Sequence, residues 1–111
     1  MVYFIEMWNA TDAWHKLSTE ERGNYMGQIG AHVQGLMEKG VEILTWSLND
    51  SDTSRKGSYD YFAIWSFPDK AAAMDFQGLV EAAGWYTYFD QKNLMGEADS
   101  AQNVIGQLVQ L

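Results

Sequence analysis

The spacing of apolar residues predicts a strand, a helix and a second strand in the first half of the chain. Residues 2–9 are rich in aromatic and β-branched types and predict the first strand. A helix is expected over residues 19–39, where apolar side chains recur at helical spacing. Ser18 and Glu21 form a capping-box pattern at its start, and Gly40 can end it with a positive φ.

The same order returns in the second half. The second strand of the first half is predicted over residues 41–48, and a polar loop joins it to a third strand over residues 59–67. A fourth strand is predicted over residues 85–94. Asp69 can cap a helix over residues 70–83. The order is therefore β-α-β-β-α-β.

Two such units interleave into a ferredoxin-like α+β fold, a four-stranded antiparallel sheet with both helices on one face. Residues 2–9 and 59–67 should form the central strands, and both are apolar on both faces. Because two helices cover only one face, a second copy is expected to cover the other, as in a dimeric α/β barrel. The C-terminal segment is the alternative cover.

That segment differs from the rest of the chain. Residues 1–96 are assigned to the ferredoxin-like domain and residues 97–111 to a helical extension. Asp99 or Ser100 can cap its helix. A free amphipathic helix of this length is marginal in water, so it should dock on its own subunit or on a partner. Its apolar face consists of Val104, Ile105, Leu108 and Val109.

Composition narrows the functional classes. The chain has 111 residues, no cysteine and a net charge of −8. The absence of cysteine excludes disulfides and thiolate metal sites, and the acidity disfavours nucleic-acid and anionic-membrane partners. No apolar run is as long as a membrane helix and no export signal is recognisable, so a cytoplasmic location is expected. Five Trp and six Tyr could fill a core, a dimer interface or an apolar pocket.

No motif indicates a metal or another cofactor. His15 and His32 are the only histidines, and they lack the spacing of zinc ligands. The loop from Asp50 begins like a calcium loop, but Arg55 and Tyr61 stand where Gly and Glu are needed. No cofactor is therefore expected.

Several glycines lie in or beside the first helix. Each costs about 1 kcal/mol relative to Ala inside a helix. Close packing on a neighbouring element is the favoured explanation, and room for a ligand between helix and sheet is the alternative. The glycines are Gly23, Gly27, Gly30, Gly35 and Gly40.

Two polar residues lie in apolar surroundings. Glu6 is in the middle of a central strand and should be at least half buried, either bonded to a Tyr, Trp or Arg or acting as a pocket acid or base. His32 borders the apolar stripe of the first helix. It is either a boundary residue or a ligand contact, and haem ligation is the weakest alternative.

A pocket between the sheet and the first helix would gather these groups. Tyr61, Ala63 and Trp65 share one strand face, and the small Ala63 leaves a notch between the two rings. The predicted ligand-binding residues are Glu6, Trp8, Met26, His32, Trp46, Tyr61 and Trp65.

Several segments resemble an uncharacterised bacterial family of small single-domain proteins. The resemblance lies in residues 3–9, 40–42, 61–65 and 84–86 and spans roughly residues 3–96. The family is similar in fold to the dimeric α/β-barrel proteins. These include cofactor-free monooxygenases of polyketide tailoring, haem-degrading enzymes and muconolactone isomerases.

The leading functional hypothesis is binding of a small apolar or amphipathic molecule, aromatic or long-chain acyl, between sheet and helices. The resemblance implies a second hypothesis, a cofactor-free monooxygenase-like enzyme. A third is a purely structural dimeric module. The expected partners are a second copy of the chain and a fatty-acid-like ligand.

Overall fold

The computed structural model describes all 111 residues. The strands are β1 (Val2–Ala10), β2 (Glu42–Leu48), β3 (Tyr61–Phe67) and β4 (Phe89–Glu97). The helices are α1 (Asp12–His15), α2 (Thr19–Met37), α3 (Lys70–Ala82), α4 (Trp85–Tyr88) and α5 (Ala101–Val109).

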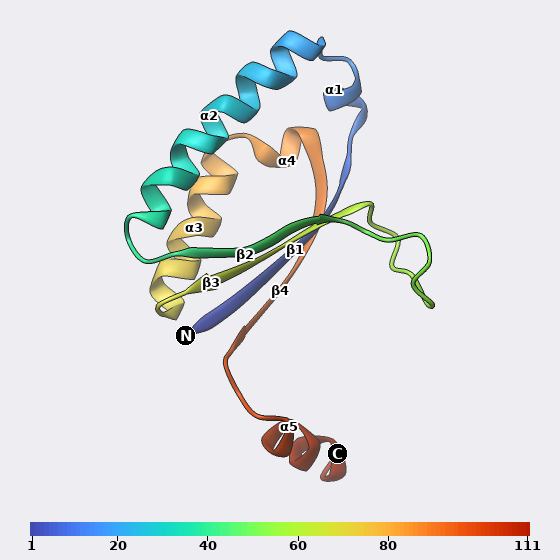
Figure 1. Ribbon diagram of the computed structural model, residues 1–111, viewed down its shortest axis with the longest axis vertical. Helices are drawn as coiled ribbons and strands as arrows, with labels where there is room; N and C mark the ends of the chain where they lie inside the picture. The colour runs from blue at the N-terminus through green and yellow to red at the C-terminus, as the bar shows by residue number, and fades with distance from the viewer.

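The four strands form one antiparallel sheet in the order β2-β3-β1-β4. The predicted α+β class and the central positions of β1 and β3 are therefore confirmed. Helices α2 and α3 lie side by side on one face of the sheet (Figure 1). The core fills the space between this face and the two helices. Its largest fully buried side chains are Trp65, Phe4 and Phe67.

Local capping interactions explain where the helices begin and end. The Ser18 side chain accepts a hydrogen bond from the Glu21 N–H, and the Glu21 carboxylate accepts one from the Ser18 N–H, so the predicted capping box is present. Asp69 accepts from the Ala72 N–H at the start of α3. Gly40 follows α2 with φ 89°, a conformation that suits glycine.

The prediction of a strand over residues 85–94 is wrong at its beginning. Gly84 has φ 74°, and the Thr87 N–H donates to the Gly84 carbonyl, which closes a helical turn over Trp85–Tyr88. The turn places Trp85 in the core, with its ring centroid 4.1 Å from that of Phe89. Aromatic residues favour strands in general, but here their burial in the core favours the turn.

The face of the sheet opposite α2 and α3 has no cover within the chain (Figure 1). Because side chains alternate along a strand, the neighbours of the core residues on β1, β3 and β4 point to this side. Apolar side chains form a continuous band across it. The band consists of Tyr3, Ile5, Met7, Phe62, Ile64 and Leu94.

Helix α5 stands apart from the sheet and from the other helices (Figure 1). Ser100 caps it by accepting from the Asn103 N–H. All its residues are exposed, including the predicted apolar face. The prediction that α5 docks on its own subunit is therefore wrong. Strand β4 pairs with β1 as far as Glu97, and the chain leaves the sheet at that end. Docking on a partner stays a prediction.

None of the five helices combines the length and the apolar character needed to cross a lipid bilayer.

Candidate functional site

Glu6 is the one acidic side chain in the core and the centre of a hydrogen-bond network. It is 4% exposed. The Trp65 Nε1–H donates to its Oε1 at 2.7 Å, and the Gln91 Nε2–H donates to its Oε2 at 2.8 Å. Gln91 in turn accepts from the Trp85 Nε1–H at 2.7 Å and donates to Asn93 Oδ1 at 2.8 Å. The Trp65 indole and the Gln91 amide therefore hold the carboxyl in one orientation, and the Trp85 indole holds the amide in place.

Strand alternation explains why an acid lies in the core. Val2, Phe4 and Trp8 lie on the same face of β1 as Glu6, and all are buried. These three apolar side chains pack in the core between the sheet and the helices. Glu6 is buried with them because it lies on the same face of the strand. Ala63 pairs with Glu6 across the sheet, so its small side chain leaves space beside the carboxyl.

Burial raises the pKa of Glu6 above its ordinary value of 4.5. The hydrogen bonds from Gln91 and Trp65 oppose this effect, because both stabilise the ionised form, but loss of water contact is the larger cause. Glu6 can therefore hold a proton at a higher pH than an exposed glutamate.

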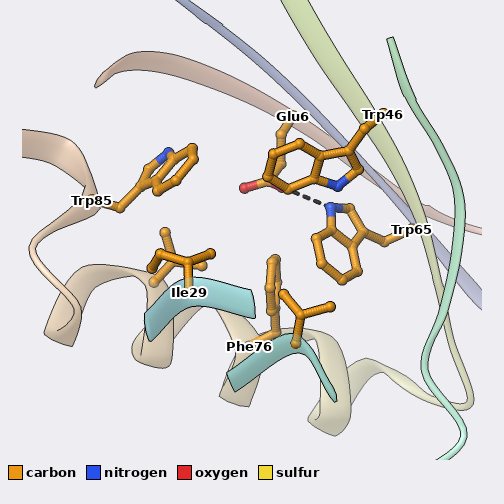
Figure 2. Close-up of a pocket in the computed structure, with 8 residues that line it drawn as sticks. Glu6, Ile29, Trp46, Trp65, Phe76 and Trp85 are labelled. Carbon is orange, nitrogen blue, oxygen red and sulfur yellow. Dashed lines mark hydrogen bonds between the residues drawn. The ribbon is translucent and has the colours of Figure 1, made fainter. Parts of the chain in front are cut away.

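A small cavity of about 40 Å³ lies beside Glu6, between the sheet and the helices. Figure 2 shows the indole rings of Trp46, Trp65 and Trp85 around the carboxyl, with α2 and α3 closing the opposite side. All its lining residues other than Glu6 are apolar. They are Ile29, Val33, Trp46, Trp65, Phe76, Val80 and Trp85.

Two grooves adjoin the cavity and share Ile29 and Val33 with it. One, of about 180 Å³, runs between α2 and α3 and includes His32. The other, of about 540 Å³, lies between α2 and the edge strand β2 and is bounded by Met26 and Trp46. The grooves are open at the surface, so they are routes by which a molecule could reach the cavity.

The predicted site residues are partly brought together. Glu6, Trp46 and Trp65 line the cavity itself. Trp8 is buried next to it, with its ring 5.1 Å from that of Trp46 and stacked on Tyr61 at 6.0 Å between centroids.

Met26 and His32 lie farther out on α2. Met26 lines only the α2–β2 groove, and His32 is exposed and lines only the α2–α3 groove. No lining residue of the His32 groove comes from the sheet, and no cluster of three or more potential metal ligands exists anywhere in the chain. His32 therefore faces a groove between the two helices and not the gap between helix and sheet in which it was expected to contact a ligand.

Sequence reasoning missed Gln91. It counted Trp85 among the aromatic residues that could line a cavity or a dimer interface, but not among the predicted ligand-binding residues. Gln91 lies on β4 in register with Trp8, which brings it to the core face of the sheet. The sequence did place Gln91 in the fourth predicted strand. The pairing of that strand with β1 could not be predicted, because the turn after Gly84 changes where the strand begins. Trp85 reaches the cavity only because α4 is a helical turn.

Close packing does not explain the glycines of α2. A Cβ added at any of them would meet no atom within 4 Å. The favoured interpretation is therefore wrong, since no neighbouring element approaches the helix at these positions. Gly30 instead forms part of the wall of the α2–β2 groove.

Comparison with known proteins places the chain in a family. One family model matches residues 1–111, the entire chain. The chain belongs to DUF6616, a family of unknown function. The expectation of an uncharacterised family is thus confirmed, and the DUF6616 match includes α5, which the resemblance seen in the sequence did not. No curated protein matches the chain.

The fold is also found in a solved structure. The crystal structure of a candidate chlorite dismutase is similar to this DUF6616 chain, with a TM-score of 0.69 and 18% sequence identity. The similarity covers 96% of this chain and 48% of that protein, so this chain spans about half of its length. At this identity the likeness shows the fold alone.

Proposed function

We propose that the protein binds a small apolar or amphipathic molecule, aromatic or long-chain acyl, between the sheet and helices α2 and α3. The observation that carries this proposal is the cavity beside Glu6, in which seven apolar side chains surround a single fixed polar group. Ligand sites are typically apolar with a few oriented polar groups. The adjoining grooves provide space for a ligand larger than the cavity.

The expected affinity is modest. Burying about eight methylene groups would contribute roughly 6 kcal/mol, at about 0.8 kcal/mol per group, before association costs. This corresponds to dissociation constants in the micromolar-to-millimolar range.

Intrinsic Trp fluorescence should change on titration with eight-carbon aliphatic compounds or with planar aromatics such as naphthol. Three Trp side chains line the cavity, so a bound molecule alters their surroundings directly. Trp65→Phe keeps an aromatic wall but removes the N–H that binds Glu6, and it should shift the response. A flat titration with every compound would contradict ligand binding and support the structural-module hypothesis.

The second candidate function is a cofactor-free, monooxygenase-like reaction. Its supporting observation is Glu6, a carboxyl with a raised pKa among aromatic rings, which could exchange a proton with a bound substrate. Oxygen uptake in the presence of a bound phenolic compound would support this function. Binding without oxygen uptake would leave ligand binding as the function.

We further propose that the fold is a ferredoxin-like dimeric α/β barrel, closed by a second copy on the open sheet face. The strand order β2-β3-β1-β4 and the helices on one face support this topology. The apolar band across the open face supports the dimer, because two-sided burial of β1 and β3 requires a second layer. An identical face on each copy suits a two-fold axis.

Sedimentation at micromolar concentration should report about twice the chain mass of 12.6 kDa. Ile64→Lys places a charge in the middle of the apolar band and should give a folded monomer. Met74→Lys, an exposed position on α3, should remain dimeric. A monomeric wild-type protein with an intact sheet would contradict the dimer.

Deleting residues 98–111 tests α5 in the same assay, and a weaker dimer is expected if α5 docks on the partner.

A further inference from the structure

We propose that the cavity beside Glu6 accepts an organic ammonium group, so that the ligand is an apolar molecule carrying a protonated amine. This inference rests on the proposed function, since it names the headgroup bound in the same cavity. Three features carry it: an acid without a basic partner, walls of indole rings, and apolar routes for a chain attached to the amine.

The first feature is the uncompensated acid. Both donors to Glu6, the Trp65 indole and the Gln91 amide, are neutral. The chain has seven Lys and Arg residues, and none of them lines the cavity or either groove. A buried carboxylate normally has a cationic partner. No side chain that lines the cavity or the grooves supplies such a partner, so a cationic group on the ligand would stabilise the ionised form of Glu6.

The second feature is the arrangement of the indoles. The ring of Trp46 is 6.4 Å from that of Trp65 at an interplanar angle of 69°, and 6.3 Å from that of Trp85 at 73°. The plane of Trp46 is thus steeply inclined to the planes of the other two rings, and Figure 2 shows all three indoles near the Glu6 carboxyl. Cations are attracted to indole faces within about 6 Å of the ring centroid, and such aromatic cages recognise ammonium groups.

The third feature is the match between volume and ligand shape. The cavity of about 40 Å³ is large enough for a headgroup but not for an alkyl chain. Ile29 and Val33 line both the cavity and the two grooves, so a chain attached to the headgroup can continue along an apolar surface.

Electrostatics discriminates among headgroups. A ligand carboxylate placed here would face Glu6 with no cation nearby. The repulsion between the two negative charges would disfavour its binding. An alcohol could donate a hydrogen bond to Glu6 without the charge attraction. An ammonium group adds that attraction, and the net charge of −8 favours its approach.

The test compares octylammonium, octan-1-ol and octanoate by isothermal titration near neutral pH. Octylammonium should bind at least about tenfold more tightly than octanoate, the scale of a hydrogen bond between charged groups. Glu6→Gln should abolish this preference. Asp75→Asn also removes one negative charge, but at an exposed position on α3, and should retain the preference.

A second variant tests the aromatic wall without disturbing the core. Trp46 is 43% exposed, so Trp46→Ala should fold. It should weaken octylammonium more than octan-1-ol. Equal affinities for octylammonium and octanoate, or an unchanged preference in Glu6→Gln, would overturn the ammonium inference while the proposed function stands. Failure of all three compounds and of the planar aromatics to bind would overturn the proposed function as well.

Discussion

Replacing Trp65 by Ala is expected to lower the free energy of unfolding by about 3–5 kcal/mol, the range for large-to-small changes of buried aromatic residues. Trp65 is 1% exposed, and its ring lies 4.6 Å from that of Phe76 and 6.3 Å from that of Phe67. The change also removes the N–H that donates to Glu6 Oε1, which leaves a buried acid with one partner fewer. Such a loss is a large part of the stability of a small domain.

Urea denaturation of matched variants would measure this effect. Trp65→Phe keeps part of the ring packing and should lose less stability than Trp65→Ala. Trp46→Ala removes a ring of the same size from a position that is 43% exposed, and it should also cost less. If Trp65→Ala and Trp46→Ala were equally mild, Trp65 would not be the central packing residue that the structure describes.

Glu6 is expected to make the protein less stable as the pH rises above 4.5. The folded pKa of Glu6 is raised, because burial disfavours the charged form. Between the unfolded pKa of 4.5 and the folded pKa, the folded state binds more protons than the unfolded state. The contribution of Glu6 to stability is therefore complete below 4.5 and is lost as the pH rises through the folded pKa.

Glu6→Gln isolates this contribution because glutamine does not titrate. The free energy of unfolding of the wild type minus that of the variant should fall across this window. Glu21 is a control of opposite sign: it is exposed, and the hydrogen bond from the Ser18 N–H lowers its pKa. Stability from Glu21 is present above 4.5 and is lost as the pH falls. A difference between the wild type and the Glu6→Gln variant that did not change with pH would contradict the raised pKa of Glu6.

Much of the fold was predictable because its signals are local. The capping box at Ser18 and Glu21, the cap at Asp69 and the positive φ of Gly40 each depend on a few neighbouring residues. The central position of β1 and β3 followed from the order β-α-β-β-α-β, and their apolar character on both faces agreed with it. The burial of Glu6 followed from its place in the middle of β1.

The site was predictable only where strand alternation determines the direction of a side chain. Glu6 and Trp65 were expected to line one pocket, although the sequence left open which face of the sheet carries Glu6; in the structure both lie beside the cavity. His32 shows the limit of the helical pattern. It borders the apolar stripe of α2, and a small rotation of that helix decides whether it faces the sheet or, as observed, an outer groove.

The sequence by itself therefore determined the order of elements, most of their ends and the presence of an acid in the core. The tertiary structure decided which side chains meet that acid. Gln91 reaches Glu6 through the register of β4 against β1, and Trp85 joins them because Gly84 turns the chain before the strand begins. Strand register and chain reversal depend on contacts between residues far apart in sequence, so no local pattern encodes them.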